Sequence, residues 1–305
     1  MVMNRLLTKM FIFIVLMVIG YVFARKGSVG KEFSRGLSSL VINLFMSASI
    51  INPVLNAELN LEPAALLNVM LVLSLTMVIA YIIAAIAARL VPVQKDNKAQ
   101  FLLLIAVMNN MFVALPVVEQ IYGAQAVFYC SLSCIPFNVL LYTYGVWHLK
   151  GGSGGGIRIK DILSIPLIAT FTALLLFITK IPVPEALCQL CATIAGGTMP
   201  LSMLVIGVSL SSVSLLDAFK NKLMYVSSFL KLVAAPVITW LVCRFFTADP
   251  MLLNVAVIIA ACPTGIVTTV LSIQYGKDPV FTSEGILQST ALSMATIPMV
   301  AWLII

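Results

Sequence analysis

The sequence predicts an all-α membrane protein with ten transmembrane helices, arranged as two inverted five-helix repeats whose fourth and ninth helices are broken. Three observations lead to this prediction. The 305 residues are 61% hydrophobic and only 10% charged, whereas soluble domains carry about 25% charged residues. The chain contains ten segments near the length of about 20 apolar residues that a helix needs to cross a bilayer. Its basic residues gather in alternate loops, as expected of a multi-pass protein.

The predicted spans follow one another with short loops, so no stretch remains that could form a separate soluble core. The first span has no convincing small-x-small cleavage site, and we therefore interpret it as a retained helix and not as a signal peptide. In chain order the spans are Leu6–Ala24, Leu37–Leu55, Ala64–Leu90, Phe101–Tyr122, Ala126–Trp147, Ile162–Thr179, Ala186–Leu210, Leu223–Phe246, Leu252–Tyr275 and Phe281–Ile305.

Basic residues concentrate in the loops after the odd-numbered spans. These loops contain Arg25, Lys26, Lys31, Arg35, Arg89, Lys95, Lys98, Lys150, Arg158, Lys160, Lys220, Lys222 and Lys277. The alternate loops contain Glu58, Glu62, Glu119, Lys180, Glu185, Arg244 and Asp249. The positive-inside rule therefore predicts cytoplasmic basic loops and both termini outside the cell (plasma) membrane, although Arg5 and Lys9 favour the opposite orientation. The net charge of +7 reflects this arrangement and does not indicate a nucleic-acid partner.

The domain organisation follows from the number of spans. Five spans in each half make the two halves insert in opposite orientations, which is the condition for an inverted repeat. Residues 1–150 form the first repeat and residues 162–305 the second. Residues 151–161 join them as a cytoplasmic linker that begins with the flexible sequence Gly-Gly-Ser-Gly-Gly-Gly. The sequence leaves open whether this linker is native or an engineered replacement.

Two spans in matching positions of the two halves are interrupted by polar residues and proline. The fourth span contains Asn109 and Asn110 before Pro116, and the ninth contains Pro263 followed by Thr264. Proline removes a backbone donor, and freed backbone groups in a membrane need protein or a wet cavity to satisfy them. Paired interruptions of this kind indicate a transporter's binding site. The alternatives are asparagines that join neighbouring helices and a simple proline kink.

The same interruptions predict an affinity for anions. The N-terminus of a half-helix carries about half a positive charge, so two half-helix termini near Pro116 and Pro263 would form an anion site without a basic side chain. Thr264, Thr268 and Thr269 would complete its polar lining.

Three further polar residues lie inside predicted spans. Lys231 lies about nine residues into the eighth span, where an ionisable residue is a candidate functional group by default. Its long stem would alternatively reach the cytoplasmic interface. Ser47 in the second span and Asn138 in the fifth are candidate lining residues, although each alone is more typical of interhelical packing.

No constellation in the sequence indicates an enzyme. The single histidine, His148, lies at a predicted membrane edge, and there is no Ser/His pair, carboxylate pair or nucleotide-binding motif. Cys188 and Cys191 form a C-x-x-C spacing without a second pair, so we interpret them as packing residues and expect no metal. We also expect no cofactor, and the energy for any transport would come from a gradient or the membrane potential.

The interrupted spans resemble those of the auxin efflux carrier family of membrane transport proteins, and the resemblance extends over essentially the whole chain. In the family's span-four pattern N-x-G-[FY]-x-G-x-P, the chain matches at Asn109, Phe112 and Pro116 and replaces the glycines by Met111 and Ala114. In the span-nine pattern, the matching residues are Pro263, Thr264, Gly265, Gln274, Tyr275 and Gly276, whereas Val267 and Ile273 replace an asparagine and a glutamate.

This resemblance implies a scaffold domain, a transport domain and crossing of spans four and nine. It also implies carriage of a small organic, carboxylate-type anion by a homodimer, and the short central loop favours a bacterial PIN-like carrier. Bile acid–sodium symporters share this architecture, so coupling to H⁺ or to Na⁺ stays open. A rival interpretation is a membrane sensor or receptor that binds a small ligand without carrying it.

Overall fold

The structure is a computed structural model that describes residues 2–27, 31–56, 59, 65–151, 165–211 and 215–304. Apart from one isolated bridge between two residues, the regular structure of these residues is helical. The linker from residue 152 onward, with the basic residues Arg158 and Lys160, lies outside the described residues, as do the loop residues Glu58 and Glu62. The prediction of an all-α protein is confirmed for the part of the chain that is described.

The chain divides into two compact units, which we call unit 1 and unit 2. Unit 1 comprises residues 1–69, 111–135 and 163–212, and unit 2 comprises residues 70–110, 136–162 and 213–305. Each unit therefore takes stretches from both halves of the sequence. The repeat boundaries at residues 150 and 162 concern the symmetry of the sequence, which this division does not test, and they stay a prediction.

The helices of unit 1 are α1 (Val2–Arg25), α2 (Lys31–Leu40), the π-helical η1 (Val41–Met46), α3 (Ser47–Asn56), α6 (Leu115–Tyr122), α7 (Ala124–Leu132), α11 (Ile165–Thr179), α12 (Glu185–Ala195) and α13 (Thr198–Leu210). Three elements continue from one unit into the other: α4 (Leu66–Leu90), the π-helical η4 (Asn110–Ala114) and α8 (Cys134–Leu140).

The helices of unit 2 are the 3-10 turn η3 (Lys95–Asn97), α5 (Lys98–Ala106), the π-helical η5 (Leu141–Gly145), α9 (Val146–Leu149), α14 (Leu215–Lys220), α15 (Lys222–Phe229), the π-helical η6 (Leu230–Ala234), α16 (Ala235–Cys243), α17 (Pro250–Ala261), α18 (Val267–Gln274) and α19 (Pro279–Ile304). The π-helical turns were not predicted. Such turns insert one extra residue into a helix and are frequent at functional sites.

The described helices agree with a protein that crosses the membrane several times. Six are long and apolar enough to span it: Gly36–Asn56, Leu66–Leu90, Ala124–Leu149, Glu185–Val208, Lys222–Cys243 and Pro279–Ile304. Three shorter apolar helices are Phe11–Arg25, Ile165–Thr179 and Pro250–Ala261. Together these helices fall on every predicted span except Phe101–Tyr122, which the structure divides. The inverted relation of the two halves stays a prediction.

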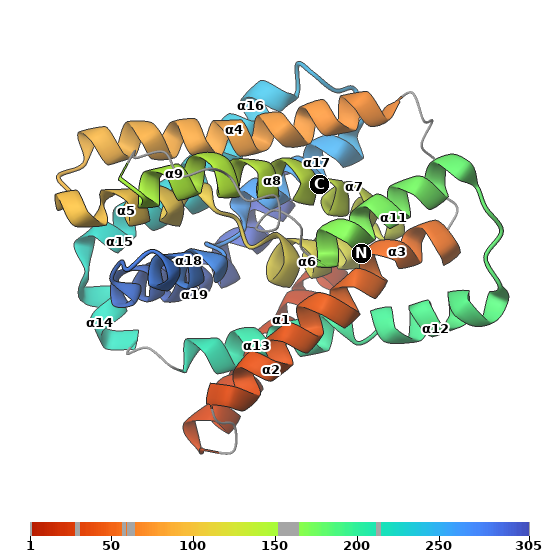
Figure 1. Ribbon diagram of the computed structural model, residues 1–305, viewed down its shortest axis with the longest axis horizontal. Helices are drawn as coiled ribbons and strands as arrows, with labels where there is room; N and C mark the ends of the chain where they lie inside the picture. The colour runs from red at the N-terminus through yellow and green to blue at the C-terminus, as the bar shows by residue number, and fades with distance from the viewer. Residues whose placement is uncertain are drawn as a thin grey trace. The chain divides into compact units, whose positions relative to one another are not determined.

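Unit 1 is held together by close helix contacts. The helix α1 crosses α13 (Figure 1), and both helices have a glycine at the contact. A Cβ atom on Gly20 would overlap the backbone of Leu204, and one on Gly207 would overlap the backbone of Met17. Small residues that let two backbones approach are typical of membrane helix pairs. Lipid tails are as apolar as the helices, so the hydrophobic effect does not drive the helices together and close packing has to.

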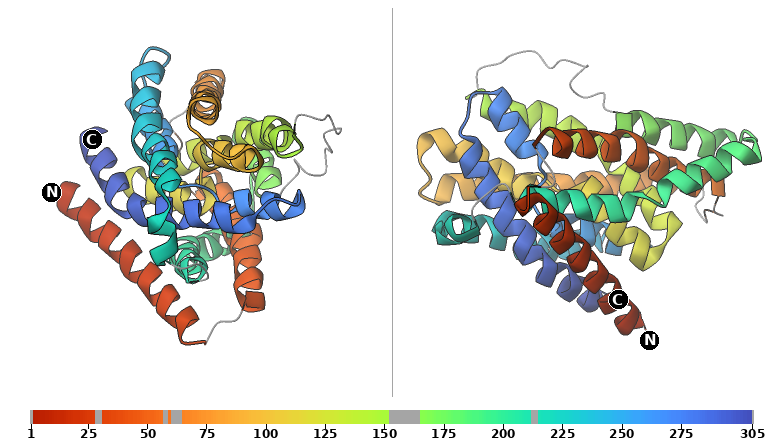
Figure 2. Two further views of the ribbon diagram at one scale, coloured as in Figure 1. Left: turned by 90° about the vertical axis from the view of Figure 1, so that its left-hand side faces the viewer. Right: turned by 90° about the horizontal axis from the view of Figure 1, so that it is seen from below.

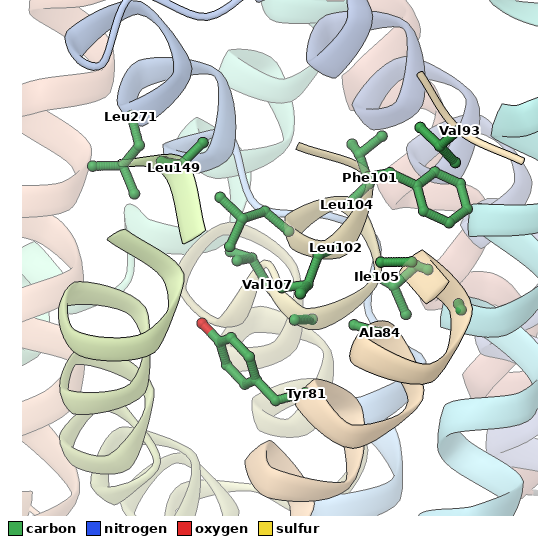
Figure 3. Packing of buried hydrophobic residues seen from close by; sticks show 14 of the residues in the cluster. Tyr81, Ala84, Val93, Phe101, Leu102, Leu104, Ile105, Val107, Leu149 and Leu271 are labelled. Atoms are coloured by element: carbon green, nitrogen blue, oxygen red, sulfur yellow. The ribbon is translucent and has the colours of Figure 1, made fainter. Parts of the chain in front are cut away.

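Unit 2 is built around α5. Every residue of this helix from Gln100 to Ala106 is buried. Figure 3 shows the apolar cluster around it, with Tyr81 and Ala84 of α4 on one side and Leu271 of α18 on another. In contrast, Leu71, Ile82 and other side chains of α4 are exposed, as expected of a helix with one face toward lipid. The predicted apolar span at Phe101 thus lies inside protein.

The long helix α19 connects several parts of unit 2. It packs against α5, α14, α15, α17 and α18 and can be followed as the dark blue helix in both views of Figure 2. Its buried side includes the consecutive polar residues Gln288, Ser289 and Thr290. Because these side chains face other helices of the unit, they can meet backbone groups that an interrupted helix leaves unpaired.

Candidate functional site

The helices α5 and α17 both end in the interior of unit 2, and their chain continuations meet there. After Ala106 the backbone of Val107 is extended, with φ −86° and ψ 118°, and after Ala261 that of Cys262 is extended, with φ −68° and ψ 147°. Met108 and Thr264 then form an isolated antiparallel bridge. The interruptions predicted in spans four and nine are therefore present, and we call residues 107–109 and 262–265 the bridge segments.

The bridge segments satisfy each other's backbone groups. The Asn109 N–H donates to the Pro263 carbonyl with an N···O distance of 2.9 Å, and the Gly265 N–H donates to the Val107 carbonyl at 3.2 Å. A buried backbone group without a partner costs free energy comparable to a lost hydrogen bond. These two bonds therefore explain how both helices can stop inside the apolar interior of unit 2, as the sequence led us to expect.

Gly265 permits this close approach. A Cβ atom on Gly265 would lie 3.0 Å from the Met108 carbonyl oxygen and 3.4 Å from Cγ1 of Val107. The first of these distances is tighter than nearly all real Cβ contacts, so a larger residue would push the bridge segments apart. Pro263, two residues before Gly265, has no N–H to lose, and its carbonyl accepts the bond from Asn109.

Thr264 is held in place by two hydrogen bonds, one from its backbone N–H and one from its side-chain hydroxyl. Its N–H donates to Oγ of Ser289 at 3.3 Å, and its hydroxyl donates to the Leu104 carbonyl near the end of α5. Thr264 is one of the predicted site residues, whereas its partner Ser289 was not predicted. The run of three polar residues, Gln288 to Thr290, within an otherwise apolar span was the available signal.

The two threonines of α18 differ in their environments. The hydroxyl of Thr269 donates to Oγ1 of Thr282 in α19 at 3.1 Å, so the structure engages this predicted lining residue with a neighbouring helix. Thr268 is completely buried, and among the described residues its hydroxyl has no hydrogen-bond partner. Of the two hydroxyls, that of Thr268 is thus the one whose proton is not engaged in a bond within the described residues.

Lys231 is completely buried, with 0% of its side chain exposed. It lies in the π-helical turn η6, which packs against α5, α17 and α19. Its Nζ has no hydrogen-bond partner within the described part of the chain, and it interacts electrostatically with the side chain of Cys262 in the bridge segments. The alternative in which the stem carries the ammonium to the membrane surface does not agree with this burial.

The helix termini at the bridge carry charges of both signs. The end next to Pro263 is the C-terminus of α17, which carries partial negative charge, as does the nearby C-terminus of α5. The positive end is the N-terminus of α18, which begins at Val267. The expectation that half-helix termini near Pro116 and Pro263 supply positive potential stays a prediction, and of the helix ends at the bridge it is the N-terminus of α18 that carries partial positive charge.

The interruption of span four also lies earlier than its proline. Pro116 lies in a continuous helical stretch that begins with the π-helical η4 at Asn110 and goes on as α6, so the proline follows a π-helical turn. The extended residues are 107–109, and Pro116 belongs to unit 1. Ser47, which begins α3, also belongs to unit 1, so neither residue is among those that the bridge gathers.

The remaining predicted residues are buried in unit 2. Asn109 and Asn110 are 5% and 3% exposed, and both make contacts with other residues. Asn138 in α8 is also buried and engaged. Unit 2 thus brings Asn109, Pro263 and Thr264 together at the bridge. Thr268 follows it by one helical turn, and Lys231 interacts with Cys262 beside it.

A second polar contact that the sequence analysis missed lies at the other end of α5. Nε2 of the buried Gln100 donates to Oγ of Ser272 at 3.2 Å and to the backbone carbonyl of Asp278. These bonds attach the first turn of α5 to α18 and to the loop that follows it. Gln100 falls one residue before the predicted start of the span, so hydropathy gave no reason to expect it inside.

Comparison of the sequence with known proteins gives a family and two relatives of nearly the same length. The family model described as "Membrane transport protein" matches residues 5–156 and 153–301. An uncharacterized transporter from Methanothermobacter thermautotrophicus is 24% identical over 290 residues, which cover 94% of each chain. An uncharacterized transporter from Methanocaldococcus jannaschii is 23% identical over 305 residues, covering 96% of this chain and 97% of the relative. The chain therefore belongs to the membrane transport protein family, that of the auxin efflux carriers.

Proposed function

We propose that this protein is a secondary active transporter that carries a small carboxylate-type organic anion across the cell membrane by alternating access, with both termini outside. The observation that carries the proposal is the Met108–Thr264 bridge between two interrupted helices, with the buried ammonium of Lys231 beside it. Interrupted helix pairs and intramembrane ionisable residues both mark substrate pathways in transporters.

Lys231 supplies the charge that selects an anion. An isolated ammonium in an apolar interior is costly unless it is paired. A carboxylate that reaches Lys231 removes this cost and gains a charge-assisted hydrogen bond, which is roughly twice as strong as a neutral one. A neutral substrate of the same shape offers no such gain, so Lys231 favours carboxylates over amides or alcohols.

The polar groups at the bridge orient the substrate. The Thr268 hydroxyl provides a donor, and the N-terminus of α18 adds positive potential. The Asn109 and Asn110 amides complete the polar surface. The hydroxyls of Thr264 and Thr269 already donate within unit 2. Removal of the Thr268 hydroxyl should therefore weaken substrate binding more than removal of either of the other two.

The driving force in this proposal is an H⁺ or Na⁺ gradient, and the working unit is a homodimer. Uptake into proteoliposomes under an imposed gradient of one cation at a time would identify the coupling ion. Acceleration by neither gradient would indicate a facilitated carrier driven by the substrate gradient or the membrane potential.

The direct test is counterflow in proteoliposomes with a panel of labelled dicarboxylates and monocarboxylates. A transporter exchanges external labelled substrate against internal unlabelled substrate, whereas a receptor binds without exchange. We expect Lys231→Gln and Asn109→Ala to lower exchange about tenfold or more, because a hydrogen bond to a charged group is worth about 1.5–3 kcal/mol.

The matched control is Lys222→Gln, which changes an exposed lysine at the start of α15 in the same span. It should exchange substrate as the unmodified protein does. Ligand binding without counterflow would establish the sensor instead. Normal exchange by Lys231→Gln would exclude the lysine from the substrate site.

A further inference from the structure

The cysteines of α12 form a pair that no part of the proposed transport site uses. Cys188 and Cys191 are three residues apart on this helix, which places them on the same face one turn apart. We propose that Cys188 and Cys191 are a redox-active dithiol, which an external disulfide oxidises reversibly to an intrachain disulfide.

Helical spacing brings the two residues within reach of a disulfide. Residues three apart on an α-helix have Cα atoms about 5 Å apart, and disulfides join Cα atoms about 4.4–6.8 Å apart. Their Cβ atoms, at about 5–6 Å on a regular helix, must approach to about 4 Å. Closing the bond therefore requires a local change of the α12 backbone, and a disulfide formed in this way is easier to reduce.

The pair also differs from the other cysteines in accessibility. Cys188 and Cys191 are half-buried, whereas Cys130, Cys134, Cys243 and Cys262 are buried. Cys188 is the fourth residue of the membrane-spanning helix Glu185–Val208, so it lies only about 5 Å along the axis from the helix start. The pair thus combines partial exposure with a position near a helix end, whereas the four other cysteines are buried.

Oxidation has a defined consequence within unit 1. Sγ of Cys191 donates to the Ala48 carbonyl of α3 at 3.3 Å, and Sγ of Cys188 donates to the Val183 carbonyl at 3.8 Å. A disulfide sulfur has no proton to donate, so both bonds are lost. The bond from Nδ2 of Asn56 to the Cys188 carbonyl, at 3.1 Å, uses the backbone and remains. Oxidation therefore weakens the contact between α3 and α12 without abolishing it.

The reaction balances with a small-molecule disulfide as the oxidant. One cysteine thiolate attacks the external disulfide, forms a mixed disulfide and releases one thiol. The second cysteine then attacks the mixed disulfide, forms the Cys188–Cys191 bond and releases the second thiol. The protein loses two electrons and two protons, and the external disulfide becomes two thiols.

The test uses the full-length protein in detergent, treated first with dithiothreitol and then with glutathione disulfide. Peptide mass spectrometry should show that the peptide containing Cys188 and Cys191 loses two hydrogen atoms, and dithiothreitol should restore them. Cys130 and Cys134, which are four residues apart in unit 1, are the matched internal control and should stay reduced. Cys188→Ser should trap Cys191 as a mixed disulfide with glutathione.

Phenylarsine oxide, which cross-links neighbouring thiols, gives an independent readout. It should bind the unmodified protein at one site and should not bind Cys188→Ser or Cys191→Ser. Equal oxidation of Cys130 and Cys134 in folded protein would overturn the proposal. So would persistence of both α12 thiols under conditions that oxidise the same peptide after denaturation.

Discussion

Lys231 is the residue whose burial most affects the free energy of folding. Its side chain is completely buried, and its ammonium has no hydrogen-bond partner within the part of the chain that the structure describes. An ionised group that is buried without a partner costs free energy, and an apolar side chain of similar volume does not carry this cost.

We therefore expect Lys231→Met to raise the midpoint of thermal unfolding while it lowers anion exchange. Circular dichroism or a thiol-independent fluorescence melt would measure the first effect, and counterflow the second. Lys222→Met, at the exposed start of the same span, should change neither. A lower melting temperature for Lys231→Met would mean that the ammonium stabilises the fold, for example through the C-terminal carbonyls of α17.

At the scale of elements, the bridge depends on a glycine. The bridge segments approach closely at Gly265, where an added Cβ would meet the Met108 carbonyl at 3.0 Å. Gly265→Val should therefore lower unfolding stability by about 1–3 kcal/mol, the usual cost of overpacking, and should abolish exchange. Gly36→Ala, where no atom lies within 4 Å of the new Cβ, should be neutral or stabilising. A fully active Gly265→Val would show that the bridge is dispensable.

A second element-scale contact, in unit 1, depends on Gly207. The backbones of α1 and α13 meet there, and any side chain on Gly207 would overlap the backbone of Met17. We expect Gly207→Val to reduce the yield of folded protein strongly, as judged by size-exclusion chromatography. Gly196→Ala, where the nearest atoms lie at an ordinary 3.6 Å, is the control. Monodisperse Gly207→Val protein with an unchanged melting temperature would contradict the close packing of α1 against α13.

At the scale of the whole molecule, the loop charges predict a definite orientation. In a background with Cys188→Ala and Cys191→Ala, we expect single cysteines at Lys95 and Lys220 to react with an impermeant maleimide only from the cytoplasm. A cysteine at Lys180 should react only from outside. Labelling of the Lys95 and Lys180 positions from the same side in intact cells would refute the ten-span topology with five spans in each half.

The parts of this protein that the sequence could predict are those decided by neighbouring residues. The length and apolarity of a segment determine whether it can cross a bilayer, and these properties placed the membrane helices. Pro263 with its polar neighbours, and Asn109 with Asn110, likewise located both interruptions, because a helix in a membrane is weakened wherever its own backbone bonds are missing.

Only the tertiary structure decided which groups replace those bonds. Residues 107–109 leave the helix where segment 262–265 supplies partners across more than 150 positions of sequence, and Pro116 instead lies within the helical stretch that η4 and α6 form. The same long-range packing buries α5 within unit 2 and leaves Lys231 inside. Hydropathy could not predict this, because a span surrounded by lipid and one surrounded by protein have the same apolar composition.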